Sequence, residues 1–350
     1  MKKTITRVSV RDIAQAAGVS KSTVGYVLRN QAGPSEKTRQ QVLRAARRLG
    51  YVPDARINSW MARVRGAKSK ELLSIAWLNT QKESDCWQKY KYLSPYLEGA
   101  RERGLELGYR LEEIWMRQPG MTMRRISQIL RQRGIEGVIV THPARHIRLD
   151  WDHLAGVAIE SDFTAPHLHR VMADLSFNIL LALKSLKRLG YRRIGLCFSD
   201  KADQIVHYLT PAILNYSHST ISKFEQIPPL FYFPENTENS SVVRQQIAVW
   251  LKRYKPDVVV GHSSHILAWV EAAGYHVPKD MGVAHIATDD DVGDWAGINS
   301  NRRAIGAIAA EMVISFIHNR QFGIPKIASH TDVRGAWHPG RTVAIPKEKH

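Results

Sequence analysis

The chain has 350 residues, 44% of them hydrophobic, and carries 50 Lys and Arg against 32 Asp and Glu. This length supplies two or three globular cores, and the excess positive charge favours polyanions as partners. No apolar run approaches the ~18 residues of a membrane span, and the opening MKKTITRVSVR lacks the apolar core of a signal peptide. The two cysteines, Cys86 and Cys197, form no C-x-x-C pair and suggest no disulfide framework, which fits a reducing cytoplasm. Together with the lack of an apolar span, this leads us to expect a cytoplasmic protein with no membrane partner.

The positive charge is concentrated at the N-terminus. Residues 1–70 hold 16 Lys and Arg but only 3 Asp and Glu, whereas the other 280 residues hold 34 and 29. A solvated basic tail is one interpretation of this segment. Its regular apolar pattern instead favours a folded basic module joined to an ordinary body.

Three short helices are predicted between residues 9 and 50. Ser9 can cap the first helix, with Asp12 three residues later as in a capping box. Gly18 ends this helix, Ser20 begins the second and Ser35 begins the third. The spacing directs the following residues inward: Val24, Val27, Leu28, Val42, Ala45, Ala46 and Leu49. A Gly-containing turn between the first two helices predicts a helix-turn-helix, and a plain three-helix bundle is the alternative.

The second helix leaves small polar side chains on its outer face. Lys21, Ser22 and Tyr26 lie there, where short side chains would allow close approach to base edges in a DNA major groove. Hydroxyl and guanidinium groups nearby suit phosphates, which position a protein on DNA without specifying sequence. The candidate DNA-binding residues of the head are Ser9, Lys21, Ser22, Thr23, Tyr26, Arg29, Ser35 and Thr38.

The segment from Val8 to Pro53 resembles, without gaps, the DNA-binding head of the lactose-repressor (LacI) family. The matching motifs are DIA, AGVS, TV, VL, S-x-x-TR and LGY-x-P. The resemblance implies a homodimeric transcriptional regulator, most simply a repressor, that binds a pseudo-palindromic double-stranded DNA operator.

Three residues of the head depart from the family pattern. Gly25-Tyr26 stands where the family commonly has Ser-Arg, and Arg29 stands where it commonly has Asn. Gly25 either permits closer backbone approach to DNA or is merely tolerated. Tyr26 cannot make the bidentate guanine contact of an arginine, so the operator sequence should differ from typical family sites.

Residues 54–70 match the hinge helix of that family. Trp60 occupies the position of a leucine that commonly wedges into the minor groove, and Ile57 lies one turn earlier. An apolar wedge kinks the duplex, and Arg56 beside it suits phosphates. Arg56, Ile57 and Trp60 therefore join the candidate DNA-binding residues. The alternative is that Trp60 packs on the body as a linker anchor.

From Leu72 onward, short apolar runs alternate with helical patterns, which predicts parallel sheets covered by helices on both faces. This body resembles the periplasmic-binding-protein-like (type I) core of the same family, with two doubly wound α/β lobes. The predicted domains are a head over 1–53, a hinge over 54–70 and a body over 71–350. The first lobe is expected over about 71–162 and 299–326, and the second over about 163–290 and 327–345. Crossovers are expected near 161–164, 288–300 and 325–330.

Ligands of such sheets bind beyond the carboxyl ends of the strands, which here meet at the cleft between the lobes. Residues just after predicted strands are the candidates, and Trp295 could stack on a flat or sugar-like ligand. The candidate effector-binding residues are Asn79, His142, Glu160, Asp162, Ser199, His262, Ser263, Asp289 and Trp295. Each could equally be an ordinary polar loop residue. The family's usual residues are absent at several of these positions, so the effector and the direction of its effect stay open.

Enzyme motifs are missing from the chain. There is no G-x-S-x-G, Walker loop or G-x-G-x-x-G, and no histidine or cysteine pattern with zinc spacing. We therefore expect no catalytic activity, cofactor or metal. The alternative interpretation is a cytoplasmic small-molecule-binding protein or enzyme with an accessory DNA-binding head.

Overall fold

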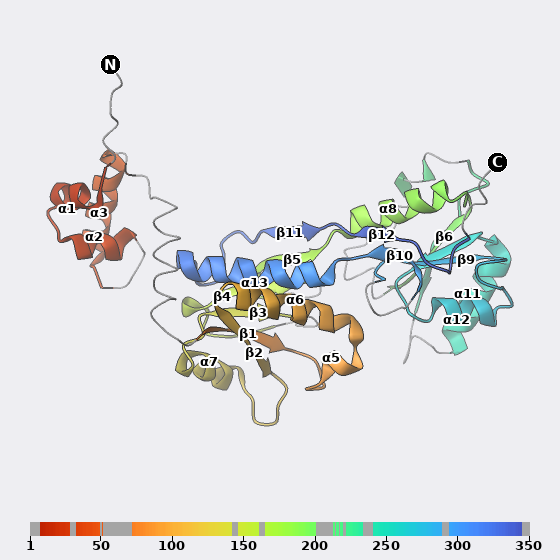
Figure 1. Ribbon diagram of the computed structural model, residues 1–350, viewed down its shortest axis with the longest axis horizontal. Helices are drawn as coiled ribbons and strands as arrows, with labels where there is room; N and C mark the ends of the chain where they lie inside the picture. Colours follow the sequence, from red (N-terminus) through yellow and green to blue (C-terminus); the bar gives the residue numbers. More distant parts are fainter. Residues whose placement is uncertain are drawn as a thin grey trace, which may run out of the picture.

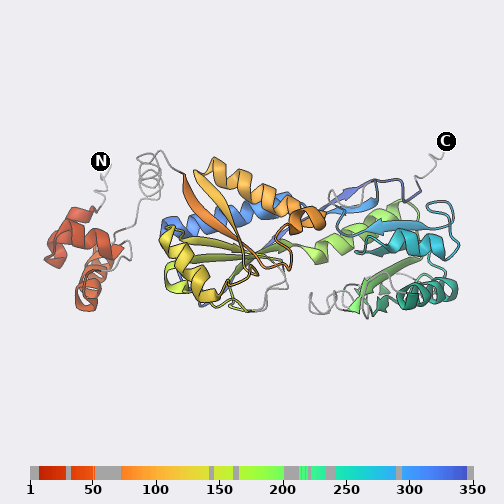
Figure 2. The same cartoon turned by 90° about the horizontal axis from the view of Figure 1, so that it is seen from below.

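The computed structural model describes residues 8–28, 33–49, 51, 72–141, 146–160, 165–200, 213, 215–216, 218–219, 222–233, 241–288 and 294–344. These residues form a helical head and a body of two α/β lobes (Figure 1). Figure 2 shows the two sheets of the body end to end, each with helices on its faces.

The head consists of three helices, as the sequence predicts: α1 (Val10–Ala17), α2 (Lys21–Leu28) and α3 (Glu36–Arg48). The capping box of Ser9 and Asp12 begins α1, and Gly18 ends it in the left-handed conformation. Ser35 caps α3. Ile13, Val24 and Val42 are fully buried where the three helices meet. The Gln41 amide donates to the Ala17 carbonyl at 2.9 Å, which ties α3 to the end of α1.

The first lobe is built on a six-stranded parallel sheet with the order β11-β5-β4-β3-β1-β2. Its elements are β1 (Leu73–Asn79), α5 (Cys86–Lys89), η1 (Lys91–Leu93), α6 (Ser94–Glu106), β2 (Tyr109–Trp115), α7 (Met123–Gln132), β3 (Gly137–Val140), η2 (Trp151–His153), β4 (Ala155–Ile159), β5 (His169–Ala173), α13 (Arg302–Asn319) and β11 (His330–Val333). Side chains alternate along β1: Ile75 and Trp77 pack toward α6 and α13, while Ala76 and Leu78 pack toward α7. Both faces are therefore buried, as a doubly wound sheet requires.

The second lobe has its own six-stranded sheet with the order β12-β10-β9-β8-β6-β7, in which only β12 is antiparallel. Its elements are α8 (Leu175–Arg188), β6 (Ile194–Ser199), β7 (Leu230–Tyr232), α11 (Ser241–Tyr254), β8 (Val258–Gly261), α12 (Ile266–Ala272), β9 (Gly282–His285), β10 (Ala296–Asn299) and β12 (Ala336–His338). Leu196 and Phe198 pack toward α8, and Cys197 packs with α11 and α12. The predicted two-lobed, doubly wound architecture is confirmed.

The chain crosses between the sheets three times, at places that differ from the expected ones. Residues 169–173 pair with β4 as the strand β5, so the first crossover follows Ala173 instead of lying near 161–164. Residues 330–333 likewise pair with β5, so the third crossover lies between β11 and β12 and not near 325–330. The second falls between β10 and α13, at the end of the expected 288–300. The sequence misplaced β5 and β11 because "HRVMA" and "HTDV" each carry several polar residues and do not read as buried strands.

Polar contacts join the three crossovers. The Asn301 side chain donates to the Arg334 carbonyl at 2.8 Å, and the Gly335 amide donates to the Asn178 side chain at 2.8 Å. The Arg334 guanidinium lies 4.8 Å from the Phe177 ring and 3.6 Å from the Asp174 carboxylate. Only glycine fits at position 335, because a Cβ added there would lie 2.5 Å from the Ile298 side chain. The crossovers therefore form one compact hinge.

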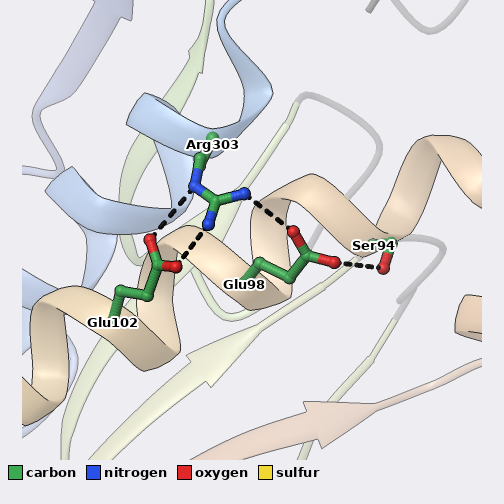
Figure 3. A network of polar contacts seen from close by, with 4 residues as sticks. All are labelled: Ser94, Glu98, Glu102 and Arg303. Carbon is green, nitrogen blue, oxygen red and sulfur yellow. Dashed lines mark hydrogen bonds and ion pairs between the residues drawn. The ribbon is translucent and has the colours of Figure 1, made fainter. Parts of the chain in front are cut away.

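Helices α6 and α13 make the closest helix contact of the first lobe. A Cβ added to Gly99 would lie 1.9 Å from the Arg303 carbonyl oxygen, and one added to Gly306 would lie 1.9 Å from that of Tyr96. Beside this contact, the Arg303 guanidinium holds the carboxylates of Glu98 (2.8 Å) and Glu102, and Glu98 also accepts from Ser94 (Figure 3). Exposed ion pairs add little stability. The distance between α6 and α13 is therefore set by Gly99 and Gly306, which let the two backbones pack closely.

Gly306→Ala should destabilise the body, because a methyl group has no space against the Tyr96 backbone. We expect a loss of about 1–3 kcal/mol in the free energy of unfolding, measured by urea denaturation. Gly104→Ala, in the same helix pair, is the control, since its added Cβ would come no closer than 3.3 Å to its nearest neighbour, the Tyr109 carbonyl oxygen. An equal loss for both variants would contradict close packing as the cause.

Candidate nucleic-acid interface and interlobe site

The outer face of α2 presents the side chains that the sequence predicted. Lys21, Ser22 and Tyr26 are exposed, and Tyr26 keeps 45% of its surface open. On the opposite side, Val24 and Val27 are buried against α1 and α3. The core thus fixes the orientation of α2 and turns one cation, one hydroxyl and one phenol toward solvent.

Hydroxyl groups cluster at the starts of α2 and α3. The Ser20 hydroxyl accepts from the Thr23 amide at 3.0 Å and lies within 2.8 Å of the Ser22 and Thr23 hydroxyls. The Ser35 hydroxyl lies 2.9 Å from that of Thr38 and accepts from its amide at 3.3 Å. Helix N-termini with exposed hydroxyls are suited to phosphate groups, because unpaired amides and the helix dipole point at the ligand.

Two residues of the head have structural roles that the sequence analysis did not separate from DNA contact. Ser9 is occupied by Asp12, whose carboxylate accepts from the Ser9 amide at 2.7 Å and from its hydroxyl at 2.8 Å. These bonds lower the pKa of the Asp12 carboxyl. Gly25 is buried inside the bundle, so it does not bring backbone close to a partner on the outer face. Arg29, Arg56, Ile57 and Trp60 lie outside the described residues.

In the second lobe, the predicted site residues meet at the carboxyl ends of adjacent strands. Ser199 ends β6, and His262 and Ser263 follow β8, which pairs with β6. The His262 ring is stacked on Phe198, with centroids 5.8 Å apart. Trp295 is half-buried and packs edge-on against His285, the last residue of β9, at 5.9 Å. Ser199, His262 and His285 therefore share the carboxyl edge of the sheet, whereas Trp295 precedes β10 and contacts His285 from the amino end of that strand.

In the first lobe, the same edge holds two predicted residues with different roles. Asn79 is 1% exposed and its amide is fully engaged in the loop after β1. It donates to the carbonyls of Glu83 and Ser84 and accepts from the Gln81 amide and the Cys86 thiol. Asn79 therefore shapes the loop and has no group left for a ligand.

Glu160 is better placed for ligand contact. It follows β4 in a left-handed backbone conformation, with φ of 65°, and is half-buried. The Tyr96 hydroxyl donates to its carboxylate at 2.7 Å. Arg302, the first residue of α13, lies 5.5 Å and 6.0 Å from the rings of Tyr92 and Tyr96. An arginine, two phenols and a carboxylate thus gather at the edge of the first lobe that carries Glu160.

Sequence reasoning missed Tyr92, Tyr96, Arg302 and His285. Tyr92 and Tyr96 lie on η1 and α6, and Arg302 begins α13 three residues after β10, so only tertiary packing brings the three together. His285 was missed because the predicted residue after this strand was Asp289, whereas β9 ends at His285. His142, Asp162 and Asp289 lie outside the described residues.

A groove of about 510 Å³ runs beside α6 and α13 on the first lobe, and Arg302 is one of the residues that line it. It is lined by charged side chains of both helices, including Glu102, Arg103 and Arg303. None of the predicted effector residues lines it. Within the described ranges, no group of His, Cys, Asp and Glu side chains has the geometry of a metal site. No helix among those described has the length and hydropathy to span a membrane.

Burial dominates the electrostatics of His285. This residue is 4% exposed, and its burial lowers the pKa of the imidazole to about 3, with the nearby His262 and Arg302 contributing. The Ala287 amide donates to Nδ1 at 3.1 Å, which leaves the proton of the neutral ring on Nε2. The Arg302 contribution also shows that the basic residue of the first lobe lies near the second-lobe site.

The head and the two-lobed body together define a helix-turn-helix protein with a periplasmic-binding-protein-like body. Residues 9–54 match the family described as "Bacterial regulatory proteins, lacI family". The head is therefore a lacI-family domain.

Curated relatives agree with this assignment, and solved structures share the fold. The chain is 30% identical to the HTH-type transcriptional regulator TreR of Salmonella typhimurium over 137 residues, or 38% of each chain. It is similar in fold to the transcriptional regulator CelR in a cellobiose complex (TM-score 0.59, 18% identity, 96% of this chain and 100% of that one). It is also similar to the lac repressor dimer bound to operator and the anti-inducer ONPF (TM-score 0.54, 16% identity, 97% and 100%). The matches to the first curated relatives span 38% of their length.

Acidification should weaken the fold through His285. Its pKa in the folded protein is about 3, against 6.5 for an ordinary histidine, so the unfolded chain binds the extra proton. This contribution to stability is complete above pH 6.5 and falls by up to about 1.4 kcal/mol per pH unit below it. Urea denaturation between pH 7 and pH 4 should show a shallower loss for His285→Asn than for the parent chain. Identical pH slopes would contradict a buried neutral imidazole.

Proposed function

We propose that this protein is a DNA-binding transcriptional regulator, most simply a repressor, that acts as a homodimer on a pseudo-palindromic operator. The observation that carries this proposal is the exposed face of α2, where Lys21, Ser22 and Tyr26 stand clear of a packed core within a lacI-family domain. A helix of this kind fits the major groove, where these groups would reach base edges.

The hydroxyl clusters at the starts of α2 and α3 support this orientation. They would lie against phosphates on either side of the groove and set the register of α2. The lac repressor dimer, similar in fold, is bound to operator DNA. A second copy of this chain would read the second half of the operator. The wedge role of Trp60 in the hinge is part of the same proposal.

We further propose that a small, sugar-like effector binds between the lobes. Glu160, Tyr96 and Arg302 would contact it from the first lobe, and His262, Ser263 and Trp295 from the second. Aromatic rings and hydrogen-bonding groups in this combination suit a ring with several hydroxyls. The CelR structure, which holds cellobiose, supports the sugar class. Binding would shift the angle between the lobes about the hinge and so change operator affinity.

Tyr26→Ala should reduce binding to a selected operator by roughly tenfold or more while leaving affinity for random duplexes nearly unchanged, because base contacts specify sequence. The operator is obtained by selection from genomic fragments, and affinities are measured by fluorescence anisotropy. Tyr216→Ala is the control, since that tyrosine is 68% exposed on the second lobe. If no fragment is retained over bulk competitor, the proposed function is wrong.

His262→Ala should abolish effector binding, whereas His276→Ala, at an exposed histidine paired with Asp280, should leave it intact. Binding is measured by calorimetry with a panel of mono- and disaccharides that includes cellobiose. Tryptophan fluorescence gives a second readout, because Trp295 lies at the predicted site. Absence of heat and of a fluorescence change for every sugar would contradict the sugar class.

A further inference from the structure

Surface cations of the two lobes differ in how often they form ion pairs. In the first lobe, most surface arginines on the helices and strands are matched with carboxylates. Examples are Arg101 with Glu113 (2.6 Å), Arg103 with Glu311 (2.5 Å) and Arg303 with Glu98 (2.8 Å). At the amino edge of the second-lobe sheet, exposed cations accumulate without such partners. This edge faces away from the first lobe, because α8 runs outward from the crossovers toward it (Figure 1).

We name this region the distal basic surface. It consists of Lys187, Arg188, Arg192, Lys252, Arg253 and Lys255. All six are exposed, and none forms an ion pair with any residue that the structure describes.

Internal contacts hold these cations on one surface. The Arg193 guanidinium donates to the carbonyls of Lys255 (3.1 Å), Tyr254 and Phe224, and lies 4.6 Å from the Phe224 ring. Arg193 therefore anchors the end of α11 beside the start of β6. Lys187, at the end of α8, is close enough to His218 that its charge helps to lower the pKa of that imidazole, after the larger effect of burial.

Two carboxylates near these cations, those of Asp257 and Glu225, accept hydrogen bonds from backbone amides. Asp257 accepts from the amides of Arg192 (2.8 Å) and Arg193 (3.0 Å). Glu225 accepts from the Ser222 amide at 3.3 Å. Both carboxylates keep their charge, and the six cations outnumber them, so the surface has a positive excess.

Helix stability accounts for part of this charge. Lys187 and Arg188 lie in the last turn of α8, and Lys252 and Arg253 lie in that of α11, where cations complement the helix dipole. It does not account for Arg192 and Lys255, which lie outside helices. Lys255 even occupies a left-handed backbone position, with φ of 47°.

We propose that the distal basic surface binds the phosphate backbone of a second DNA segment, independently of sequence. Long, exposed cations without ion-pair partners, contributed by two helix ends and the adjoining loops, suit regularly spaced phosphates. A chain that holds one duplex through its head and another through this surface would bridge two DNA segments. Binding of DNA at the distal basic surface needs no property of the head, so the first experiment tests it separately from the proposed function. Only the bridging of two segments rests on that function.

Lysine acetylation mapped by mass spectrometry locates the contact. With the full chain and an excess of random-sequence duplex, acetylation of Lys187, Lys252 and Lys255 should slow several-fold, while that of Lys82 on the first lobe is unchanged. If only head lysines such as Lys21 are protected, the proposal is overturned. It is equally overturned if polyglutamate at the same charge concentration protects the distal lysines as well as DNA does, because the surface would then fit acidic polypeptides.

A charge-matched pair of variants tests bridging. Beads carrying the selected operator are saturated with protein, and capture of a free random-sequence duplex is measured against salt. Lys187→Gln/Lys252→Gln/Arg253→Gln should reduce the slope of log affinity against log salt by about 2.7, the value for three phosphate contacts. The control Arg124→Gln/Arg125→Gln/Arg148→Gln removes three exposed, unpaired cations from the first lobe and should leave capture unchanged. An equal loss in both variants would assign the effect to net charge and overturn the proposal.

Discussion

Parallel strands end together, and this constraint places the candidate effector residues that follow strands. In the first lobe, β1, β3 and β4 are adjacent and parallel, so Asn79 and Glu160 reach the same edge although 80 residues separate them. In the second, β6, β8 and β9 bring Ser199, His262 and His285 together in the same way. Since the faces of both sheets are covered by helices, these edges are where polar side chains collect.

The hinge formed by the three crossovers limits how the two sheet edges can move relative to each other. Three crossovers tied by Asn178, Asn301 and Arg334 leave the lobes few ways to move except rotation about that point. The α6–α13 pair, held close by Gly99 and Gly306, makes the first lobe a rigid body. Because Arg302 begins α13 beside the hinge, a ligand that contacts it would act directly on the element that links the site to the crossover.

Polar side chains at the predicted sheet edges either stabilise the local loop or stay available to a ligand. Their hydrogen-bond partners show which role each side chain has. Asn79 and Glu160 both follow strands of the same sheet. The Asn79 side-chain amide makes four hydrogen bonds to residues that follow β1, whereas the Glu160 carboxylate accepts one hydrogen bond from the Tyr96 hydroxyl on α6. In the head, Ser9 is likewise consumed by Asp12, while Lys21 and Tyr26 remain exposed. A polar residue at an expected site is therefore a candidate only when its hydrogen-bonding capacity is not already used.

The sequence by itself determined the helical head, its caps at Ser9, Gly18 and Ser35, its inward face and the doubly wound, two-lobed body. These follow from local signals: capping residues, turn glycines and apolar periodicity act over a few residues, and the family motifs lie in one unbroken segment. Tertiary structure alone decided that β5 and β11 belong to the first sheet, that Gly25 is buried, and that Tyr96, Arg302 and His285 join the interlobe edge. Strand pairing and helix packing join residues far apart in the chain, and neither periodicity nor spacing records which partner a segment will meet.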